Sequence, residues 1–462
     1  MTAEATYGAY DSPDAYDETR ALPLADGSRP GPHGTRLLSG WFTDGRPADL
    51  TDHLDRYGPP PIERAAARNG HESALVRAVE AAGLTGRGGA AFPTAIKMRG
   101  VASGRGPAVV VANGMESEPA SSKDRTLLQL APHLVLDGIA LAAQAVGANE
   151  AHLCVARPRT EQIRELRAAL AERERRGLDR IPVQLHELPH HYVSSEETSL
   201  VNWLNGGDAR PMSTPPRPFE KGVDKRPTLI DNVETLAHLA LIARYGGDWY
   251  REAGAPDAPG TTLVSLSGAV RHPGVYEAPM GSTIGHLLNH GGGPSGPLSA
   301  ILVGGFFGSW LPARTAAETR FTKEDLAALG AGPGAGILVA LPHQSCGLAE
   351  TASILAFLAN NSAQQCGPCR FGMPAVADDF ATLAFGQADP SVLMRLEQRT
   401  GLLAGRGACR HPDGAARLAA TALSTFAADV QNHLRYGPCP GADLPPVLDV
   451  PDSPVPDPEE WK

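Results

Sequence analysis

Between about residues 75 and 245, short apolar runs alternate with longer stretches in which apolar residues recur at helical spacing. The runs are rich in β-branched residues and have the length of buried strands. Because strands that alternate with helices form parallel sheets, we expect an α/β domain over residues 36–255. The predicted strands are 108–113, 151–156 and 181–188, and the predicted helices between them are 132–147 and 160–176.

Two other patterns follow this domain, and different textures precede and close the chain. Residues 256–341 contain short strands, turns and one helix, which predicts a small α+β module. Residues 342–440 carry amphipathic stretches of helical period, which predict a helical bundle. The segments 1–35 and 441–462 are rich in Asp, Gly, Pro and Ser, and this composition predicts disorder. The predicted helices of the bundle are 348–361, 391–403 and 415–434.

Composition excludes several classes of protein. A net charge of −10 over 462 residues argues against a nucleic-acid partner, which requires a basic surface. We find no signal peptide, and the best apolar run carries Asp137 and is too short to span a membrane. Six cysteines in so long a chain do not form a disulfide framework. We therefore expect a cytoplasmic protein, in which the paired cysteines of QQCGPCRFG (364–372) indicate metal or redox chemistry.

The densest feature of the chain is a glycine-rich stretch, GLTGRGGAAFPTAIK (83–97). Glycines let backbone N–H groups crowd around a phosphate, and Arg87 and Lys97 add cationic donors. A flexible turn is the competing interpretation of a glycine cluster. The glycines within the loop are Gly83, Gly86, Gly88 and Gly89.

A second polar stretch, NGMESEPASSKDR (113–125), follows the first predicted strand. Ligands of open α/β sheets bind outside the carboxyl ends of the strands. Asn113, Glu116 and Glu118 are therefore candidates for a pocket, although glutamates in a loop are often simply solvated.

The order of these motifs resembles the NADH-oxidising flavoprotein subunit of respiratory complex I and its relatives in NAD-linked hydrogenases and formate dehydrogenases. The resemblance spans roughly residues 40 to 435. It implies a Rossmann-like FMN-binding domain, a β-grasp (soluble-ligand-binding) domain at 256–341 and a helical iron–sulfur domain at 342–440. The matching blocks are GRGGAAFPTAIKM (86–98), NGMESEPASSKDR (113–125), SSEETSL (194–200), DNVETL (231–236), QQCGPCRFG (364–372) and Cys409.

The resemblance also implies roles for individual residues. The glycine loop, Gly86 to Gly89 with Arg87, and Lys97 would hold FMN, Phe92 would stack on NADH, and Glu118 would border the hydride site as the catalytic residue. The remaining flavin contacts would be Asn113, Glu116, Tyr192, Glu196, Glu197, Asn232 and Thr235.

The departures from the family pattern gather at this same site. Gly100 and Arg217 stand where the family has phenylalanines, and each lost ring removes stacking worth roughly 1–3 kcal/mol. Arg217 offers a guanidinium plane or a phosphate contact instead. We therefore expect a flavin pocket and do not expect NADH to bind in the family's manner. The three histidines His186, His190 and His191 are either proton donors or surface residues. The other departures are Met115, Ser195, Thr214, Asp231, His190 and His191.

In the family, four cysteines hold a 4Fe-4S cluster, and Cys366, Cys369 and Cys409 match three of them. Ala363 occupies the position of the fourth. Three alternatives remain: a 4Fe-4S cluster completed by His411, water or a small molecule, a 3Fe-4S cluster, or zinc held as Cys3His. The other cysteines are not expected to complete the site: Cys346 and Cys439 are separated from it by helices of about 22 and 30 Å, and Cys154 lies within a strand.

Two functions are compatible with this sequence. The first is electron transfer, in which the chain passes electrons from NAD(P)H or another donor, through FMN and an iron–sulfur cluster, to a ferredoxin-like acceptor within a hetero-oligomer. The alternative is a non-catalytic relative that keeps the fold and an iron–sulfur or zinc site as a scaffold.

Overall fold

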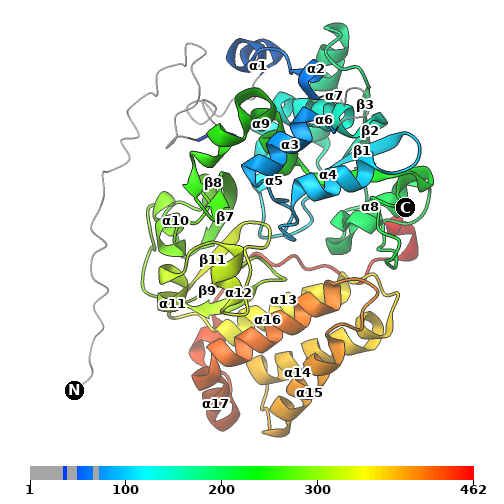
Figure 1. The fold of residues 1–462 in the computed structure, drawn as a ribbon. Coiled ribbons are helices and arrows are strands. Elements are labelled where there is room, and N and C mark those ends of the chain that lie inside the picture. Colours follow the sequence, from blue (N-terminus) through cyan, green and yellow to red (C-terminus); the bar gives the residue numbers. More distant parts are fainter. Residues whose placement is uncertain (1–34, 39–48, 66–71) are drawn as a thin grey trace.

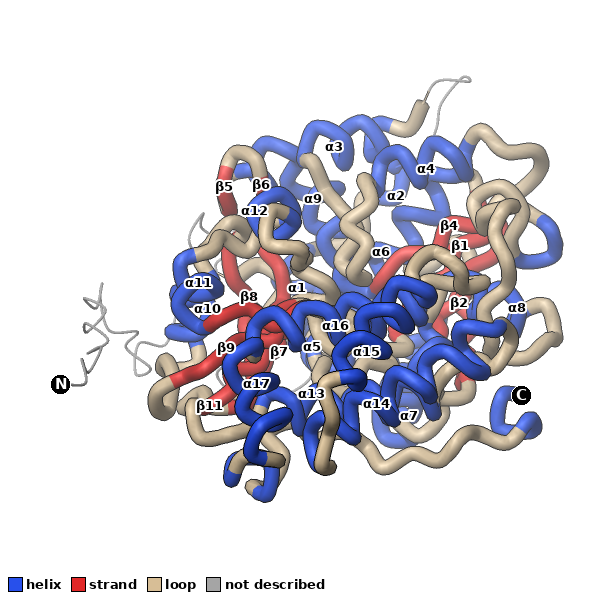
Figure 2. Tube along the Cα trace, turned by 90° about the horizontal axis from the view of Figure 1, so that it is seen from below, coloured by secondary structure: helices blue, strands red, loops and turns tan. Residues whose placement is uncertain are grey.

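The computed structural model describes residues 35–38, 49–65 and 72–462. The disorder expected for residues 1–35 falls almost entirely outside the described residues. Figure 1 shows the α/β domain above, a second sheet at the side and a bundle of helices below. Seen from below, the two sheets lie on either side and the helices of the bundle extend across them (Figure 2).

The first domain is built on a four-stranded parallel sheet with the order β3-β2-β1-β4, which confirms the expected α/β class. The apolar runs predicted three of its strands. The fourth strand was missed because its five residues, TLIDN, are too few for a period to emerge. The strands are β1 (Ala108–Gly114), β2 (Ala148–Ala156), β3 (Val183–Leu188) and β4 (Thr228–Asn232). The helices are α1 (Leu50–Tyr57), α2 (Ile62–Ala65), α3 (Ala74–Ala82), α4 (Thr94–Ala102), α5 (Lys123–Leu130), α6 (Pro132–Val146), α7 (Thr160–Arg175), α8 (Glu197–Leu204) and α9 (Val233–Arg251).

The second sheet has five strands in the order β10-β9-β11-β7-β8. Strands β11 and β7 are parallel and the other pairs are antiparallel, as a β-grasp arrangement requires. Its strands are β7 (Thr261–Gly268), β8 (Gly274–Pro279), β9 (Leu298–Val303), β10 (Ser309–Pro312) and β11 (Ile337–Pro342), with the short pair β5 (Gly254–Ala255) and β6 (Ala258–Pro259) before them. Its helices are α10 (Ile284–His290), α11 (Ala313–Glu318) and α12 (Lys323–Ala327).

The third region is helical. The single helix predicted at 415–434 is divided in two at Phe426, whose backbone is not helical (φ −103°, ψ 30°). The Phe426 ring packs on Trp310 of β10 at 5.4 Å, and this contact joins the bundle to the second sheet. The elements are α13 (Gly347–Asn360), the π-helical turn η3 (Pro368–Gly372), α14 (Met373–Phe385), α15 (Ser391–Leu403), α16 (His411–Thr425) and α17 (Ala427–Tyr436).

The expectation of disorder at residues 441–462 is wrong. This segment, red in Figure 1, runs from the bundle to the α/β domain. Glu350 of α13 accepts hydrogen bonds from the backbone N–H groups of Val447 (2.7 Å) and Leu448 (3.2 Å). At the far end Trp461 is 1% exposed, and the Ala209 N–H donates to its carbonyl. Composition alone missed these few apolar anchors and the buried carboxylate that binds the backbone. Short 3₁₀ turns, η4 (Pro440–Asp443) and η5 (Pro458–Trp461), lie within it.

A buried ionic cluster organises the helices of the α/β domain. Asp137 of α6 is fully buried and contacts His53 Nε2 and Arg173 Nη2, both at 2.8 Å, and also Arg244. Burial alone would raise the Asp137 pKa, but these three partners hold it well below its ordinary value. Among the described residues, no single helix is long and apolar enough to cross a membrane; α5 and α6 pass that test only as a pair bent by 96°.

We expect Asp137→Asn to lower the free energy of unfolding by about 3–5 kcal/mol, because it removes the carboxylate that pairs with the buried Arg244 and one of the two that pair with Arg173. Because the pKa of this carboxyl is lower in the folded state than in the unfolded state, Asp137 stabilises the fold above pH ~4. This stabilisation is lost as the pH falls further. Denaturant titration of both proteins at pH 7 measures the difference. Glu161→Gln, which breaks an exposed pair with Arg164, is the control and should cost less than about 0.5 kcal/mol. Equal effects of the two substitutions would contradict this account.

Candidate functional site

The glycine-rich stretch forms a tight loop that leads into α4. Its ends are joined by hydrogen bonds from Gly86 N to Phe92 O (2.9 Å) and from Thr94 N to Leu84 O (3.0 Å). A Cβ atom at Gly88 would lie 3.4 Å from the Asn232 Cβ, so the loop passes close to the end of β4. Gly89 has φ +110°, which L side chains rarely adopt. Small residues therefore leave the backbone of this loop open to a ligand. Phe92 is 46% exposed beside it.

Arg87 does not extend from this loop as a free phosphate donor. Its backbone N–H donates to Thr235 Oγ1 (2.9 Å), and its guanidinium is buried against Tyr250 Oη (2.9 Å) and Thr261 O (3.2 Å). Arg87 and Thr235 therefore fasten the glycine loop to α9 and to β7. The expectation that Arg87 adds a cation to the pocket is corrected accordingly.

Lys97 belongs to a polar cluster drawn from α4, β4 and α8. Its Nζ donates to Ile230 O (2.7 Å) and lies 3.4 Å from Asp231 Oδ1 and 3.9 Å from Glu197 Oε2. Glu197 is also 3.7 Å from the exposed guanidinium of Arg217. Lys97, Glu197 and Arg217, which the sequence placed near the flavin or the dinucleotide, therefore lie together.

Asp231 has a buried polar atom that a ligand could bind. Its Oδ2 is buried and has no hydrogen-bond partner, and burial raises the pKa of the carboxyl. Thr94 Oγ1, on the first turn of α4, is likewise buried and unpaired. With the open glycine backbone and Lys97, these groups suit the phosphate and polar ring edge of a flavin mononucleotide.

Glu116 has a structural role that the sequence did not indicate. Its carboxylate accepts hydrogen bonds from Asp124 N (2.8 Å), Arg125 N (2.9 Å) and Ser121 Oγ (2.7 Å). These contacts satisfy the N–H groups at the start of α5, as a helix cap does. Asn113 Nδ2 donates to Ser195 O (2.8 Å). Both residues shape the carboxyl edge of the sheet around the pocket.

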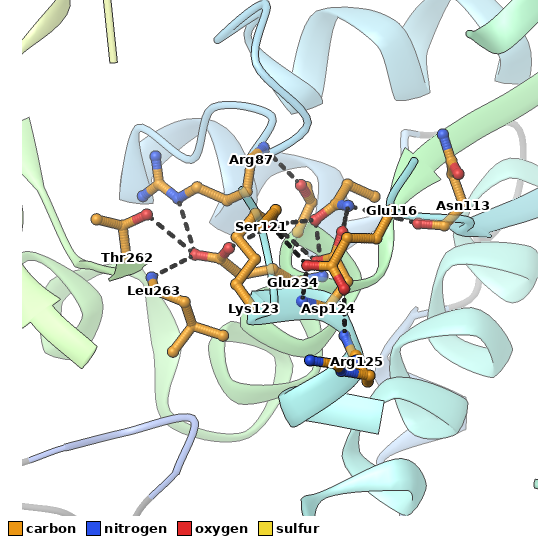
Figure 3. A network of polar contacts seen from close by, with 12 residues as sticks. Arg87, Asn113, Glu116, Ser121, Lys123, Asp124, Arg125, Glu234, Thr262 and Leu263 are labelled. Carbon is orange, nitrogen blue, oxygen red and sulfur yellow. Dashed lines mark hydrogen bonds and ion pairs between the residues drawn. The ribbon is translucent and has the colours of Figure 1, made fainter. Parts of the chain in front are cut away.

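Glu234 is the centre of the polar network in Figure 3, and the sequence interpretation missed it. This fully buried residue on the first turn of α9 accepts hydrogen bonds from Leu263 N (2.9 Å) and Thr262 Oγ1 (3.1 Å) of β7. It also pairs with Lys123 Nζ at 2.9 Å. Lys123 in turn donates to Asp124 Oδ1 and Asn232 Oδ1. Glu234 thus connects the flavin-side motifs to the second sheet; its position in DNVETL was the available signal.

Glu118 lies where the α/β domain meets the second sheet. Its Oε2 accepts hydrogen bonds from Tyr192 Oη (2.7 Å) and Phe306 N (3.0 Å). A Cβ atom at Gly305 would come within 2.9 Å of that oxygen, so a glycine is required there. Burial raises the pKa of Glu118 to about 7, even though both hydrogen bonds favour the ionised form. A carboxyl with this pKa can hold or release a proton near neutral pH.

The Tyr192 ring joins this carboxyl to the helical region. Tyr192 belongs to a 3₁₀ turn, η1 (Tyr192–Ser195), and its ring packs edge-on against Phe307 (4.8 Å), Phe357 (5.8 Å) and His411 (5.6 Å). Glu196, directly after η1, caps α8 through Thr198 N (2.8 Å). The negative charge of Glu196 is also felt at Cys409, where it helps to raise the thiol pKa.

The three expected cysteine ligands lie together beyond these rings. Cys366 and Cys409 both lie near enough to Cys369 to help raise the pKa of its thiol. Burial raises the pKa of Cys369 well above its ordinary value and that of Cys409 to about 11. A metal-bearing group supplies the positive charge that the thiolate forms need, so three converging thiols fit an iron–sulfur cluster. Ala363 is buried in the same region and offers no ligand.

His411 is buried, and one of its two ring nitrogens has a hydrogen-bond partner. Its Nε2 lies 2.7 Å from the Leu358 carbonyl, which fixes the proton on that nitrogen, while Nδ1 is buried without a partner. Burial lowers the His411 pKa to about 4, so the ring is neutral. A neutral ring with a bare Nδ1 keeps the ligand role open in chemical terms. Its assignment as the fourth ligand stays a prediction.

The remaining departures have local explanations. Met115 is fully buried in an apolar cluster with β1, so this position has become core. The ring of Phe219 covers Gly100, with only 3.2 Å between Phe219 Cδ2 and an added Cβ. The sequence interpretation missed that aromatic replacement. His186 bonds to His152, and His191 packs on Trp461 at 4.2 Å, so neither is directed at Glu118 by any contact described for it.

Comparisons with known proteins agree with this geometry. Residues 79–241 match the model of the Nuo51 FMN-binding domain, residues 263–303 the SLBB domain, and residues 349–433 the iron–sulfur binding region of NADH-ubiquinone oxidoreductase-F. The chain is similar to the second F-subunit of the NADH-quinone oxidoreductase of Rhizobium meliloti, with 32% identity over 87% of this chain and 96% of that protein. It is 33% identical to the corresponding F-subunit of Streptomyces coelicolor over 79% of this chain and 84% of that protein.

A solved structure resembles the chain as a whole. The crystal structure of an NAD⁺-reducing [NiFe]-hydrogenase in the H₂-reduced state matches with a TM-score of 0.73 and 31% identity, over 88% of this chain and 68% of that one. The expected family and fold class are therefore confirmed, and with them an FMN-binding and an iron–sulfur-binding region. This chain belongs to the family of NADH-quinone oxidoreductase F-subunits.

Proposed function

We propose that this chain is the electron-entry component of a larger redox complex, and that it oxidises NAD(P)H or a related donor. When bound, FMN accepts an electron pair, and the iron–sulfur centre carries single electrons onward. The observation that carries this proposal is the position of Tyr192. Its hydroxyl binds Glu118 at the flavin side and its ring packs on His411 at the cysteine side, so both sites share one wall.

The protein's own residues define the pocket that the proposal requires. The backbone of the glycine loop and Lys97 would bind the flavin phosphate. Asp231, whose pKa is raised by burial, can donate a hydrogen bond in its protonated form as an amide would. Glu118 would hold a proton beside the donor site. The packed rings of Tyr192, Phe306 and Phe307 would separate that site from the cysteines.

A partner protein would dock on the cysteine side. Phe371, beside Cys369 in η3, is 72% exposed, and Leu402 on the adjacent α15 is 47% exposed. Large apolar side chains on a surface next to a redox centre suit a protein partner that takes the electrons. This favours the electron-transfer function over the scaffold alternative.

The proposal is tested on protein purified without oxygen. We expect flavin absorbance and an EPR signal from the reduced centre, and bleaching of the flavin on addition of NADH or NADPH. Colourless protein that contains zinc at the three cysteines would support the scaffold function instead. A coloured protein that neither nucleotide reduces would assign a different donor.

The ligand assignment predicts opposite effects of two substitutions. Cys369→Ser should lose most of the iron, because it removes one of three converging thiolates. Ala363→Cys supplies a thiolate at the vacant family position and should shift the EPR signal towards that of a fully cysteine-ligated 4Fe-4S cluster. Iron analysis and EPR measure both. Full iron content in Cys369→Ser would show that the assignment is wrong.

Tyr192→Phe should raise the pKa of Glu118 from about 7 to about 8, since it removes a hydrogen bond that favours the carboxylate. The pH profile of kcat/KM for donor oxidation would shift by the same amount. Infrared titration of the carboxyl band gives a readout that does not depend on turnover. Glu118→Gln is the control and should abolish the titration. An unshifted carboxyl band in Tyr192→Phe would show that the Tyr192 hydroxyl does not influence the pKa of Glu118.

A further inference from the structure

A second cluster of metal-ligating side chains lies away from the three cysteines discussed above. Cys346, His433 and Cys439 place their Sγ, imidazole nitrogen and Sγ atoms all within 4.8 Å of one another. Cys346 directly precedes α13, and the sequence places the three-thiol site beyond the other end of that helix. Since α13 has 14 residues and rises about 1.5 Å per residue, the two sites are separated by about 21 Å.

The orientation of His433 is set for a metal. Its Nδ1 lies 3.0 Å from the Leu383 carbonyl and donates to it, which leaves Nε2 without a proton. This Nε2 lies 3.7 Å from Cys346 Sγ and accepts the Cys439 N–H at 3.1 Å. Because Nε2 has a single lone pair, a bound zinc ion takes the place of this N–H, which then turns away from the ring. A backbone carbonyl that fixes the tautomer of a ligating histidine is the common second contact at metal sites.

The separations and burial also suit zinc. Tetrahedral Zn²⁺ with Zn–S of about 2.3 Å and Zn–N of about 2.0 Å places a sulfur and a nitrogen ligand about 3.5 Å apart. The observed distance between Cys346 Sγ and His433 Nε2 is 3.7 Å. Both residues are buried, and Cys439 is partly exposed. Within the part of the chain that the structure describes, no fourth Cys, His, Asp or Glu joins the group.

We propose that Cys346, His433 and Cys439 bind one Zn²⁺ ion, with a water molecule in the fourth position. The ion joins the start of α13, the end of α17 and the segment that follows. There the Cys346 N–H faces Gly441 O at 3.4 Å, and a Cβ atom at Gly441 would collide with Gln344 O at 2.4 Å. Because Gly441 has no side chain, the closing segment can lie this close to the backbone before α13.

This site secures the closing segment at one end. From Cys439 the segment passes Glu350 and ends against the α/β domain, where Arg210 lies 4.6 Å over the Trp461 ring. His191, next to Tyr192, packs on the same ring. Zinc at Cys439 thus holds one end of the segment whose other end packs on the α/β domain.

The test is metal analysis of the full-length chain, purified with zinc and iron supplied. We expect about one zinc per chain in addition to the cluster iron. Cys439→Ser and His433→Asn should weaken zinc binding at least about tenfold and leave iron unchanged. Asparagine at 433 retains a donor for Leu383 O, so loss of zinc there is separable from misfolding. Zinc K-edge absorption should give two sulfur neighbours, one imidazole nitrogen and one water oxygen.

Two controls distinguish this site from the cluster. Cys366→Ser should lose iron and keep zinc, and His286→Asn, at an exposed histidine of α10, should keep both. Three results would overturn the proposal: no zinc in the unmodified protein, iron in place of zinc at these residues, or a Cys346–Cys439 disulfide found by mass spectrometry after alkylation without reductant.

Discussion

The buried charge of Glu234 is the constraint on which the arrangement of this protein depends. Glu234 accepts hydrogen bonds from β7 of the second sheet and pairs with Lys123, and Arg87 of the glycine loop lies 3.9 Å away. A carboxylate without solvent is tolerable only when such partners surround it, so the partners must stay in place. The loop, the start of α5 and the second sheet are therefore fixed relative to one another before any ligand binds, which is the preorganisation that a cofactor site needs.

Glu118 is a second buried carboxylate that connects different regions of the chain. One carboxylate oxygen accepts a hydrogen bond from a hydroxyl of the α/β domain and another from the N–H of Phe306, in the loop between β9 and β10. The tyrosine that donates the hydroxyl packs against the helical region. Three regions of the chain thus meet at one titratable group. A change in the position of any region alters the burial of Glu118 and hence its pKa. Proton affinity at the flavin side and packing at the cysteine side are coupled through Tyr192.

Local patterns in the sequence were sufficient for much of the fold. The period of apolar residues located β1, β2 and β3, and the motif order identified the family. What local patterns could not give was the use of each polar side chain. Arg87, Glu116 and Asn232 look like ligand contacts in a motif, and the fold also gives each a structural contact. Arg87 donates to Tyr250 Oη, Glu116 accepts from the first turn of α5, and Asn232 donates to Asp124. Only the tertiary structure shows which donors are left over, as at Asp231 and Thr94.

The six cysteines illustrate this limit most clearly. The length of α13 puts Cys346 at the opposite end of that helix from the loop with Cys366 and Cys369, because rise per residue is a local property. The 30 Å expected for Cys439 assumed one continuous helix, which the structure divides at Phe426. Their approach to each other depends on how α17 packs on α14 and α16 and on the path of the segment after it, which no local period encodes. Distances measured only from the cluster cysteines do not show whether Cys346 and Cys439 lie close to each other. A chain that folds back on itself can build a second site from residues that the first one excludes.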